Sequence, residues 1–527
     1  MKRIKGYFAN LIFPAFVFGS ITGILTAIII VLYKLLAKFV IAFSEDSYIF
    51  LRNDWRFIPL ALVVFLGVAL LFSHIYKKYP RVSGGGIPSS IALLRNIVTF
   101  KWLRTLIGVF FMSMTSFLIG VPLGNEGPSV LMGTAIGKGC VKTMAKNRPA
   151  WCGYAMTGGA CAGFAVATGA SVSGILFAVE EAHQRISPLI LIVGCIAVLC
   201  AQFTSELLCP LFNLSTSLFP QMNVITLGVK DVWIPIVIGV VTGLFAVVFL
   251  RCYHAISNFC NIKLKKVPHS IKIFLVCVLT LVFGLISFSF ISTGHEIFSL
   301  FLEQNVAVYG LIILLVVRTF LTLLANTNKL TGGVFVPIMA LGIILAGIIG
   351  KGLQAVGLSS EYYTVILALG VGACISAMMK MPLTAVVFSL EALGCTNNVL
   401  YVIIVVAVSF IITEIFGAEG INDSILNNII KAQEETNERK IIDTYVTIKK
   451  GSFAEYRRAK DIIWPSNFFL LSIIPSKSRR NQQSAEIFHE GDVLHIRYAT
   501  FDQSNTKKEL IAIVGEQDYN EESVVSE

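Results

Sequence analysis

The feature that most constrains this chain is a series of long segments without a charged side chain. The first runs from residue 6 to residue 33, and others lie at residues 105–125, 149–179 and 330–350. About 20 consecutive apolar residues are enough to cross a bilayer as a helix. Only 14% of the 527 residues are charged, whereas soluble proteins carry about a quarter. The sequence therefore excludes an ordinary soluble enzyme and predicts a membrane protein with many spans.

The basic residues indicate how the chain is oriented in the membrane. Residues 1–5 read Met-Lys-Arg-Ile-Lys, directly before the first uncharged segment, and the chain has a net charge of +11. Lysine and arginine in short loops favour the cytoplasmic side. We therefore expect a multi-pass membrane protein whose N-terminus lies in the cytoplasm. The positive charge is not gathered on a polar domain, so a nucleic-acid polymer is not an expected partner.

Motifs of other protein classes are missing from the sequence. None of the eleven cysteines forms a Cys-x-x-Cys pair, so neither a disulfide framework nor a zinc site is expected. The chain has no nucleophile elbow, phosphate-binding loop or dinucleotide fingerprint. We expect a protein that is not an enzyme and that carries no cofactor.

Charged residues are sparse up to about residue 430 and dense beyond it. We therefore predict a transmembrane domain at residues 1–430, a linker at 431–443, a small α+β domain at 444–516 and a disordered tail at 517–527. In the small domain, the residue pattern predicts strands at 444–448, 468–474, 493–498 and 510–514, and a short helix at 454–463.

Two motifs occur twice at nearly the same separation, which indicates two related halves. Residues 124–133 and 333–342 share the spacing Gly-x-x-x-Pro-x-x-x-x-Gly, and residues 173–180 resemble residues 384–391, at offsets of 209 and 211 residues. Gly and Pro also interrupt several apolar runs, and irregular backbone at membrane depth is tolerated only beside protein or a water-filled cavity. Repeats and broken helices together favour a transporter or channel with an ion site between its halves.

Three glycine-containing segments offer groups that suit an anion. Residues 83–88 read Ser-Gly-Gly-Gly-Ile-Pro. Successive glycines before a helix let backbone N–H groups converge on an anion. The alternative is a plain loop between two membrane helices. Residues 124–128 read Gly-Asn-Glu-Gly-Pro, and Glu126 follows 21 uncharged residues. An ionisable group at such depth is a functional hypothesis, with a solvated helix end as the alternative. Residues 332–337 repeat the second segment without an acid.

Acidic residues near these segments could couple an anion to a proton. An ionised Glu126 could occupy an anion site and block it, and a protonated one could swing away and carry a proton. Glu180 and Glu181 follow a 31-residue uncharged run. This pair offers either a proton route on the cytoplasmic side or the solvated end of a helix.

In their order and spacing, these motifs resemble the CLC family of chloride channels and anion/proton antiporters. The family patterns G-S-G-I-P, G-R/K-E-G-P and G-x-F-x-P correspond to residues 84–88, 124–128 and 333–337, and residues 174–181 resemble the stretch that ends in the family's internal glutamate. The resemblance implies an all-α polytopic fold of about eighteen tilted, partly broken helices in two inverted halves. It also implies a homodimer with one pathway per subunit.

The resemblance further implies roles for single residues. Glu126 falls on the external gating glutamate, which alternately blocks the anion path and carries a proton, and Glu181 falls on the internal proton glutamate. Val334 and Phe335 fall on residues whose backbone amides face the central anion. The other anion-binding candidates are Gly84, Gly85, Gly86, Ile87, Asn125, Gly127 and Asn422.

Three positions depart from the family pattern. Gly85 stands in place of the central serine, Asn422 in place of the central tyrosine, and Asn125 in place of a basic residue. Such a turn without that serine and tyrosine resembles the fluoride/proton antiporter branch, although methionine is common there at the serine position. Fluoride is small and strongly hydrated, and close backbone and amide donors could serve it. We expect fluoride export in exchange for protons, with a chloride/proton antiporter or chloride channel as the alternative.

The C-terminal segment is similar to the RCK-C (TrkA-C) ligand-binding domain. The similarity lies in Thr444–Phe453, Trp464-Pro465 and Glu490–Ile496. It implies a cytoplasmic regulatory module. With the CLC resemblance, we expect a multi-pass protein of the cell (inner) membrane with both termini in the cytoplasm. Some relatives of the module bind a cyclic dinucleotide at their dimer interface. There are two alternatives. The module could stabilise a dimer without binding a ligand, or the whole chain could be a membrane sensor in which ligand binding by this domain is the main function.

Overall fold

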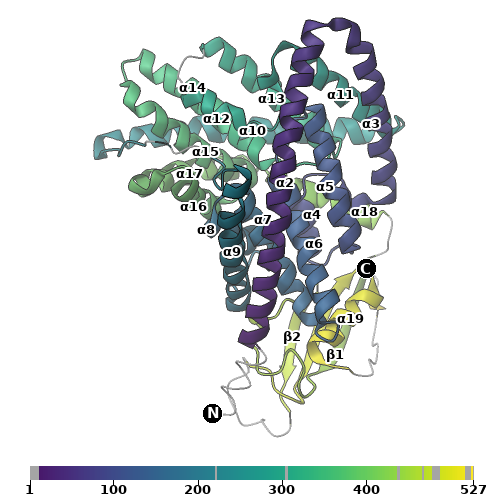
Figure 1. The fold of residues 1–527 in the computed structure, drawn as a ribbon. Coiled ribbons are helices and arrows are strands. Elements are labelled where there is room, and N and C mark those ends of the chain that lie inside the picture. Colours follow the sequence, from purple (N-terminus) through teal and green to yellow (C-terminus); the bar gives the residue numbers. More distant parts are fainter. Residues whose placement is uncertain are drawn as a thin grey trace.

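The structure, a computed structural model, describes residues 11–527 except for residues 220, 221, 223, 303–306, 436–438, 466, 467, 477–486, 517–523, 526 and 527. Two helical halves are followed by a small sheet domain (Figure 1). The first half contains α2 (Phe13–Asn53), α3 (Ile58–Lys78), α4 (Ile87–Leu94), α5 (Trp102–Ile119), α6 (Glu126–Met144), α7 (Cys152–Thr168), α8 (Ser171–Phe177) and α9 (Pro188–Leu208). The second half contains α10 (Trp233–Asn258), α11 (His269–Ile286), α12 (His295–Leu302), α13 (Val308–Thr327), α14 (Phe335–Ala355), α15 (Tyr363–Met379), α16 (Pro382–Ala392), α17 (Val399–Ile415) and α18 (Ile421–Glu434).

The helical domain has the composition and burial of a membrane domain. Ten helical stretches among the described residues are long and apolar enough to cross a membrane, which confirms the prediction of many spans. The outer faces of α2 and α3 expose large apolar side chains such as Phe39, Phe43 and Leu60, as lipid-facing helices do. By contrast, α6, α7, α14 and α15 are buried along most of their length. These four helices form the centre of the domain.

Two short helices connect the halves through reciprocal contacts. α8 and α16 contain the repeated segments. Glu180 follows α8 and caps the start of α16, and Glu391, near the end of α16, caps the start of α8. Glu180 accepts hydrogen bonds from Leu383 and Thr384 at the start of α16, at 2.6–2.8 Å. Glu391 accepts hydrogen bonds from residues 171–173 at the start of α8, at 2.6–3.2 Å. Contacts that exchange partners in this way are those of a two-fold relation, here between the two halves of one chain.

The small domain contains an antiparallel sheet with the strand order β2-β3-β1-β4. Its strands are β1 (Lys440–Thr447), β2 (Phe468–Ile474), β3 (Val493–Thr500) and β4 (Val524–Val525). Three of the four predicted strands are confirmed, and β1 starts at Lys440 rather than at residue 444. Most of the predicted tail at 517–527 lies outside the described residues, and its described part is β4.

Two predictions for this domain are wrong. The predicted strand 510–514 is the end of helix α19 (Gln503–Val514), because Asp502 caps that helix by accepting a hydrogen bond from Asn505 N–H. Its apolar residues are buried at helical spacing rather than in alternation. The predicted helix 454–463 is a series of turns with one 3₁₀ turn at Ala459–Asp461. Tyr456 interrupts it with a φ of +62°, a conformation that helices exclude.

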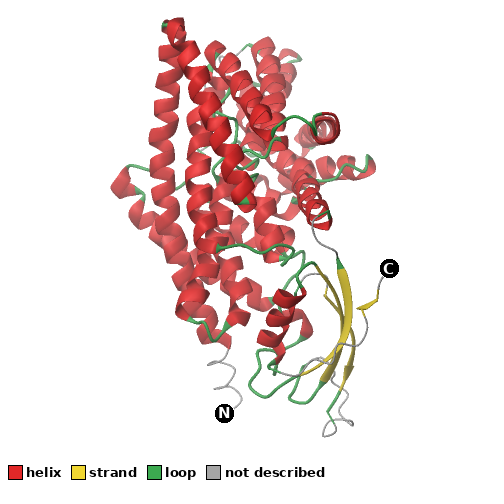
Figure 2. Cartoon of the chain, turned by 90° about the vertical axis from the view of Figure 1, so that its right-hand side faces the viewer, coloured by secondary structure: helices red, strands yellow, loops and turns green. Residues whose placement is uncertain are grey.

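The small domain docks directly against one end of the helical domain (Figure 2). The Tyr154 hydroxyl, near the start of α7, donates to Asp461 O at 2.7 Å and accepts from Ile463 N–H at 3.0 Å. The Trp151 ring contacts the Phe453 ring edge-on at 5.6 Å. Ile463 also belongs to an apolar cluster of the helical domain that includes Leu11. The start of the described chain and the small domain therefore lie on the same side of the molecule.

We expect Tyr154→Phe to weaken this docking. The change leaves the carbonyl of Asp461 and the N–H of Ile463 without their partner, and each unsatisfied buried group costs about 1–3 kcal/mol. Limited proteolysis between the two domains measures the effect, and cleavage should become faster in the variant. Tyr33→Phe is the matched control, because the buried Tyr33 hydroxyl bonds Ser113 within the helical domain. Equal cleavage of Tyr154→Phe and wild type would contradict the expectation.

Candidate functional site

Two glycine turns from the two halves pair with each other in the centre of the domain. Gly124 N–H donates to Gly333 O at 2.7 Å, and Gly333 N–H donates to Gly124 O at 2.7 Å. These are the first residues of the repeated Gly-x-x-x-Pro motif. The pairing therefore brings the start of α6 and the start of α14 to one place.

The first glycine segment joins this pair from a third direction. Gly84 N–H donates to Lys329 O at 2.9 Å and Gly332 N–H donates to Gly84 O at 3.4 Å. Gly86 has a φ of +77°, and a Cβ on it would lie 2.1 Å from Gly127 O. Only glycine allows such an approach and such a φ. The three segments that carry the sequence motifs are therefore interlocked.

This arrangement gathers the N-termini of α4, α6 and α14. Val334 is the N-cap of α14 and Phe335 its first residue, and Asn125 is the N-cap of α6. The first N–H groups of a helix have no intrahelical acceptor, and the helix dipole favours negative charge at this end. Several helix starts pointing to one place suit an anion. The predicted motifs are thus brought together in space.

The Ile87 amide, like that of Gly84, already has a backbone partner. Its N–H donates to Gly85 O at 2.9 Å, so this donor is already used by the turn that precedes α4. Ile87 therefore shapes the segment, and its role at the anion stays a prediction.

Phe335 is held by an aromatic cluster that joins the halves. Its ring is completely buried and contacts the rings of Phe164 and Phe388 edge-on, at 5.1 and 5.4 Å. Phe164 in turn stacks on Phe177 at 5.5 Å. Phe177 and Phe388 occupy equivalent positions of the repeated segments. The backbone at the start of α14 is therefore fixed from both halves.

Glu126, the first residue of α6, lies at the meeting point of the turns. Its side chain is completely buried, and neither carboxylate oxygen has a hydrogen-bond partner of good geometry among the described residues. A Cβ on Gly124 would lie 2.4 Å from Glu126 Oε2, so the carboxylate lies directly over the paired glycine turn. The N–H group of Val336 and the ammonium group of Lys34 are near it. Glu126 is therefore an unpaired acid at the convergence of helix starts.

The residues that depart from the family pattern take different positions. Asn125 is buried, its side chain does not cap α6, and its Oδ1 has no partner within the described part of the chain. Gly85 has room for a side chain, since a Cβ there would meet only Pro88 Cδ at 3.7 Å and Gly332 O at 3.8 Å. The Asn125 side-chain amide and the backbone of Gly85, which no side chain covers, therefore lie beside the paired glycine turns.

Asn422 lies beside Glu181 instead. The two side chains face each other, but both polar atoms of Asn422 are buried without a hydrogen bond to the described residues. Glu181 is 5% exposed, and its Oε1 is also unpaired there. Arg95 fixes this region by donating to Glu181 O at 2.8 Å and to Ala182 O at 2.9 Å. Asn422 thus accompanies Glu181.

The neighbouring Glu180 differs from both sequence-based interpretations of the acid pair. Its carboxylate accepts three hydrogen bonds at the start of α16, so it is neither a mobile proton carrier nor a solvated helix end. Sequence reasoning also missed Lys34 and Arg95, which belong to no motif. Lys34, within an apolar helix, could have been found as a cation at membrane depth.

The chain is similar to known proteins over most of its length. The family model described as voltage-gated chloride channel matches residues 64–414. The H(+)/Cl(-) exchange transporter ClcA of Vibrio parahaemolyticus serotype O3:K6 is 24% identical over 431 residues, which are 80% of this chain and 90% of that protein. ClcA of Klebsiella pneumoniae subsp. pneumoniae is 25% identical over 72% of this chain and 82% of its own length.

Two solved structures share the fold. A slow cyanobacterial Cl-/H+ antiporter superposes with a TM-score of 0.71 at 20% identity, covering 80% of this chain and 99% of its own. A CLC-type fluoride/proton antiporter superposes with a TM-score of 0.63 at 19% identity, covering 76% of this chain and 95% of its own. At such identities these similarities establish the fold alone.

Proposed function

Because the chain belongs to the voltage-gated chloride channel family, we propose that it is a proton-coupled anion antiporter that exports fluoride in exchange for protons. The observation that carries the proposal is the Glu126 carboxylate, which is fully buried and unpaired among the described residues, where helix N-termini meet. An ionised carboxylate there competes with an anion for the same N–H groups. Protonation removes that competition, and the neutral side chain is free to move and carry the proton.

Glu181 is the second proton group of the proposed mechanism. It is buried, its Oε1 is unpaired within the described chain, and it lies towards the small domain, held through its backbone by Arg95. A proton accepted from outside by Glu126 would pass to Glu181 and then to the cytoplasm, while the anion moves outwards past the glycine turns. We assign the anion to the segments formed by Gly84, Gly85, Gly86, Ile87, Asn125, Gly127, Val334 and Phe335. The amides of Gly84 and Ile87 already have backbone partners, so the others are the proposed donors. Asn422, beside Glu181, would contact the anion on its way from the cytoplasm.

The departures from the family pattern support fluoride. Glycine at position 85 removes a hydroxyl and leaves backbone accessible, and the Asn125 side chain is not used for capping. A small anion with a tightly held hydration shell needs close and strong donors to replace its water. The H(+)/Cl(-) exchange transporters among the relatives favour the second candidate function, a chloride/proton antiporter of the same fold.

We assign the cytoplasmic side to the end that carries the small domain. Lys77 and Lys78 end α3, Arg81 lines a cavity with residues of the small domain, and Arg148 lines another with Phe453. Basic residues near span ends favour the cytoplasm. Both termini would then be cytoplasmic. We further propose a homodimer in the inner membrane, with an RCK-C-like module at 444–516 that binds a cyclic dinucleotide.

Flux in liposomes tests the proposed function. Purified protein is reconstituted in vesicles loaded with fluoride or with chloride, and anion efflux and proton uptake are recorded together. The proposal expects fluoride efflux with proton uptake and little chloride efflux. Equal or faster chloride efflux would establish the chloride candidate, and efflux without proton uptake would contradict antiport. Absence of any anion flux would favour the sensor interpretation.

A further inference from the structure

A cavity of about 690 Å³ separates the helical domain from the small domain on the side of Glu181. Its walls come from both domains: Arg95 and Asp423 belong to the helical side, and Trp464 and Phe501 to the small domain. Glu181 itself is not among the described residues that form the wall. A proton that leaves Glu181 for the cytoplasm therefore needs a group that reaches both.

Asp423 is placed to be that group. It is the third residue of α18, follows Asn422, whose side chain faces Glu181, and itself lines the cavity. The carboxylates of Asp423 and Glu181 are close enough to repel each other electrostatically. Arg95 interacts with both of them and bonds the backbone of Glu181. The two acids therefore share one cation.

The other acids nearby are already engaged. Glu180 caps α16 through three hydrogen bonds. Glu419 lines the same cavity but accepts hydrogen bonds from Ser424 and Asn427. The Asp423 carboxylate has electrostatic partners but no hydrogen bond among the residues that the structure describes, so unlike the other acids it is not engaged in a cap or a turn.

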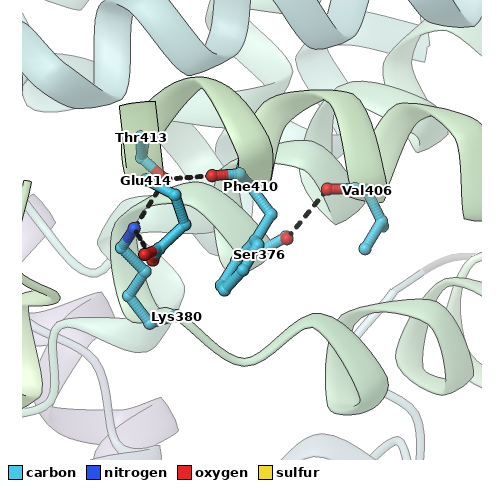
Figure 3. Close-up of polar contacts among 6 residues, drawn as sticks. All are labelled: Ser376, Lys380, Val406, Phe410, Thr413 and Glu414. Atoms are coloured by element: carbon cyan, nitrogen blue, oxygen red, sulfur yellow. Dashed lines mark hydrogen bonds and ion pairs between the residues drawn. The ribbon is translucent and has the colours of Figure 1, made fainter. Parts of the chain in front are cut away.

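The charged groups that face Asp423 come from each element around it. Arg95 at the end of α4 and Lys380 at the end of α15 attract it, whereas Glu419 and Glu181 repel it. Lys380 is itself bound by Glu414 at 2.6 Å and by Thr413 at 2.8 Å (Figure 3), which moderates its pull on Asp423. His254 on α10 bonds Ser424, one residue further along α18. Burial raises the pKa of the Asp423 carboxyl above its ordinary value.

We propose that Asp423 carries protons between Glu181 and the interdomain cavity. This inference rests on the proposed antiport. In the direction of proton uptake, the protonated Glu181 carboxyl gives its proton to the Asp423 carboxylate through a water molecule, and Asp423 then gives it to water in the cavity. Each proton hop breaks one O–H bond and forms one, and the relaying water gives up one proton as it accepts another, so nothing beyond water takes part.

Asp423→Asn tests the inference in the flux assay. A positioned proton-transfer group contributes about 10²–10⁴-fold, and because water can partly replace a relay, we expect the proton flux to fall by about tenfold or more. Anion efflux should continue, so fewer protons move per anion. Asp423→Glu should restore the ratio. Asp423→Ser also removes the carboxylate, and it serves as the test if Asp423→Asn does not fold.

Glu419→Gln is the matched control, because it removes a carboxylate from the same cavity without removing the relay. It should keep the wild-type number of protons per anion. An unchanged ratio in Asp423→Asn, or an equal fall in Glu419→Gln, would overturn the inference while leaving the antiport intact. Wild-type protein that moves anions without protons would overturn the proposed function and this inference with it.

Discussion

Glu126→Gln should stop coupled proton movement, which would fall by at least about 100-fold because a group that transfers protons in such a site contributes about 10²–10⁴-fold. Glutamine keeps the size of the side chain and removes its ability to bind a proton reversibly. It also cannot act as an anion that blocks the turns. Anion efflux should therefore continue without proton uptake, and simultaneous recording of both in loaded vesicles measures the separation.

The structure predicts that this variant folds. The Glu126 carboxylate is completely buried and makes no hydrogen bond to the described residues, so its replacement breaks no such bond, and a neutral group is cheaper to bury than a charged one. Glu180→Gln is the matched control: that carboxylate caps α16, so its loss should lower stability and leave coupling unchanged. Intact coupling in Glu126→Gln would remove Glu126 from the mechanism.

The sequence predicted the motifs that meet because each is a local pattern with a local cause. Glycine before proline marks a helix start, and the repeated spacing indicated that residues 124–128 and 333–337 are equivalent. Their direct pairing through Gly124 and Gly333 could not be predicted, since it depends on how the halves face each other. The same holds for Glu180, whose capping partner is about 200 residues away along the chain.

The small domain shows a different limit. The segment Leu510–Val514 is apolar and short, and such a run suits a strand as well as a helix. Asp502, eight residues earlier, decides between them by capping α19. A role for Asp423 could not be predicted for a related reason. A charged residue just after the last apolar span is common, and only its place in the cavity wall and beside Asn422 indicates a function.

Gly85→Ser should shift transport from fluoride towards chloride. The position has space for the side chain, because a Cβ there meets only Pro88 Cδ at 3.7 Å and Gly332 O at 3.8 Å. Serine restores the hydroxyl of the family pattern, which would lie further from the backbone and suit the larger chloride ion, whereas fluoride would still depend on the close backbone donors. A hydroxyl that donates to a charged group contributes about 1.5–3 kcal/mol. The ratio of chloride to fluoride efflux should therefore rise by about tenfold or more, measured in vesicles loaded with one anion or the other.

Two further variants separate the hydroxyl from the volume that serine adds. Gly85→Ala supplies the same Cβ without a donor and should keep the wild-type ratio. Gly86→Ala places its Cβ 2.1 Å from Gly127 O, so it should disrupt the interlocked turns and reduce the efflux of both anions. If Gly85→Ser and Gly85→Ala change the ratio equally, the space at position 85 sets selectivity. If neither changes it, position 85 does not face the anion, and the loss of the central serine is no reason to assign fluoride to this protein.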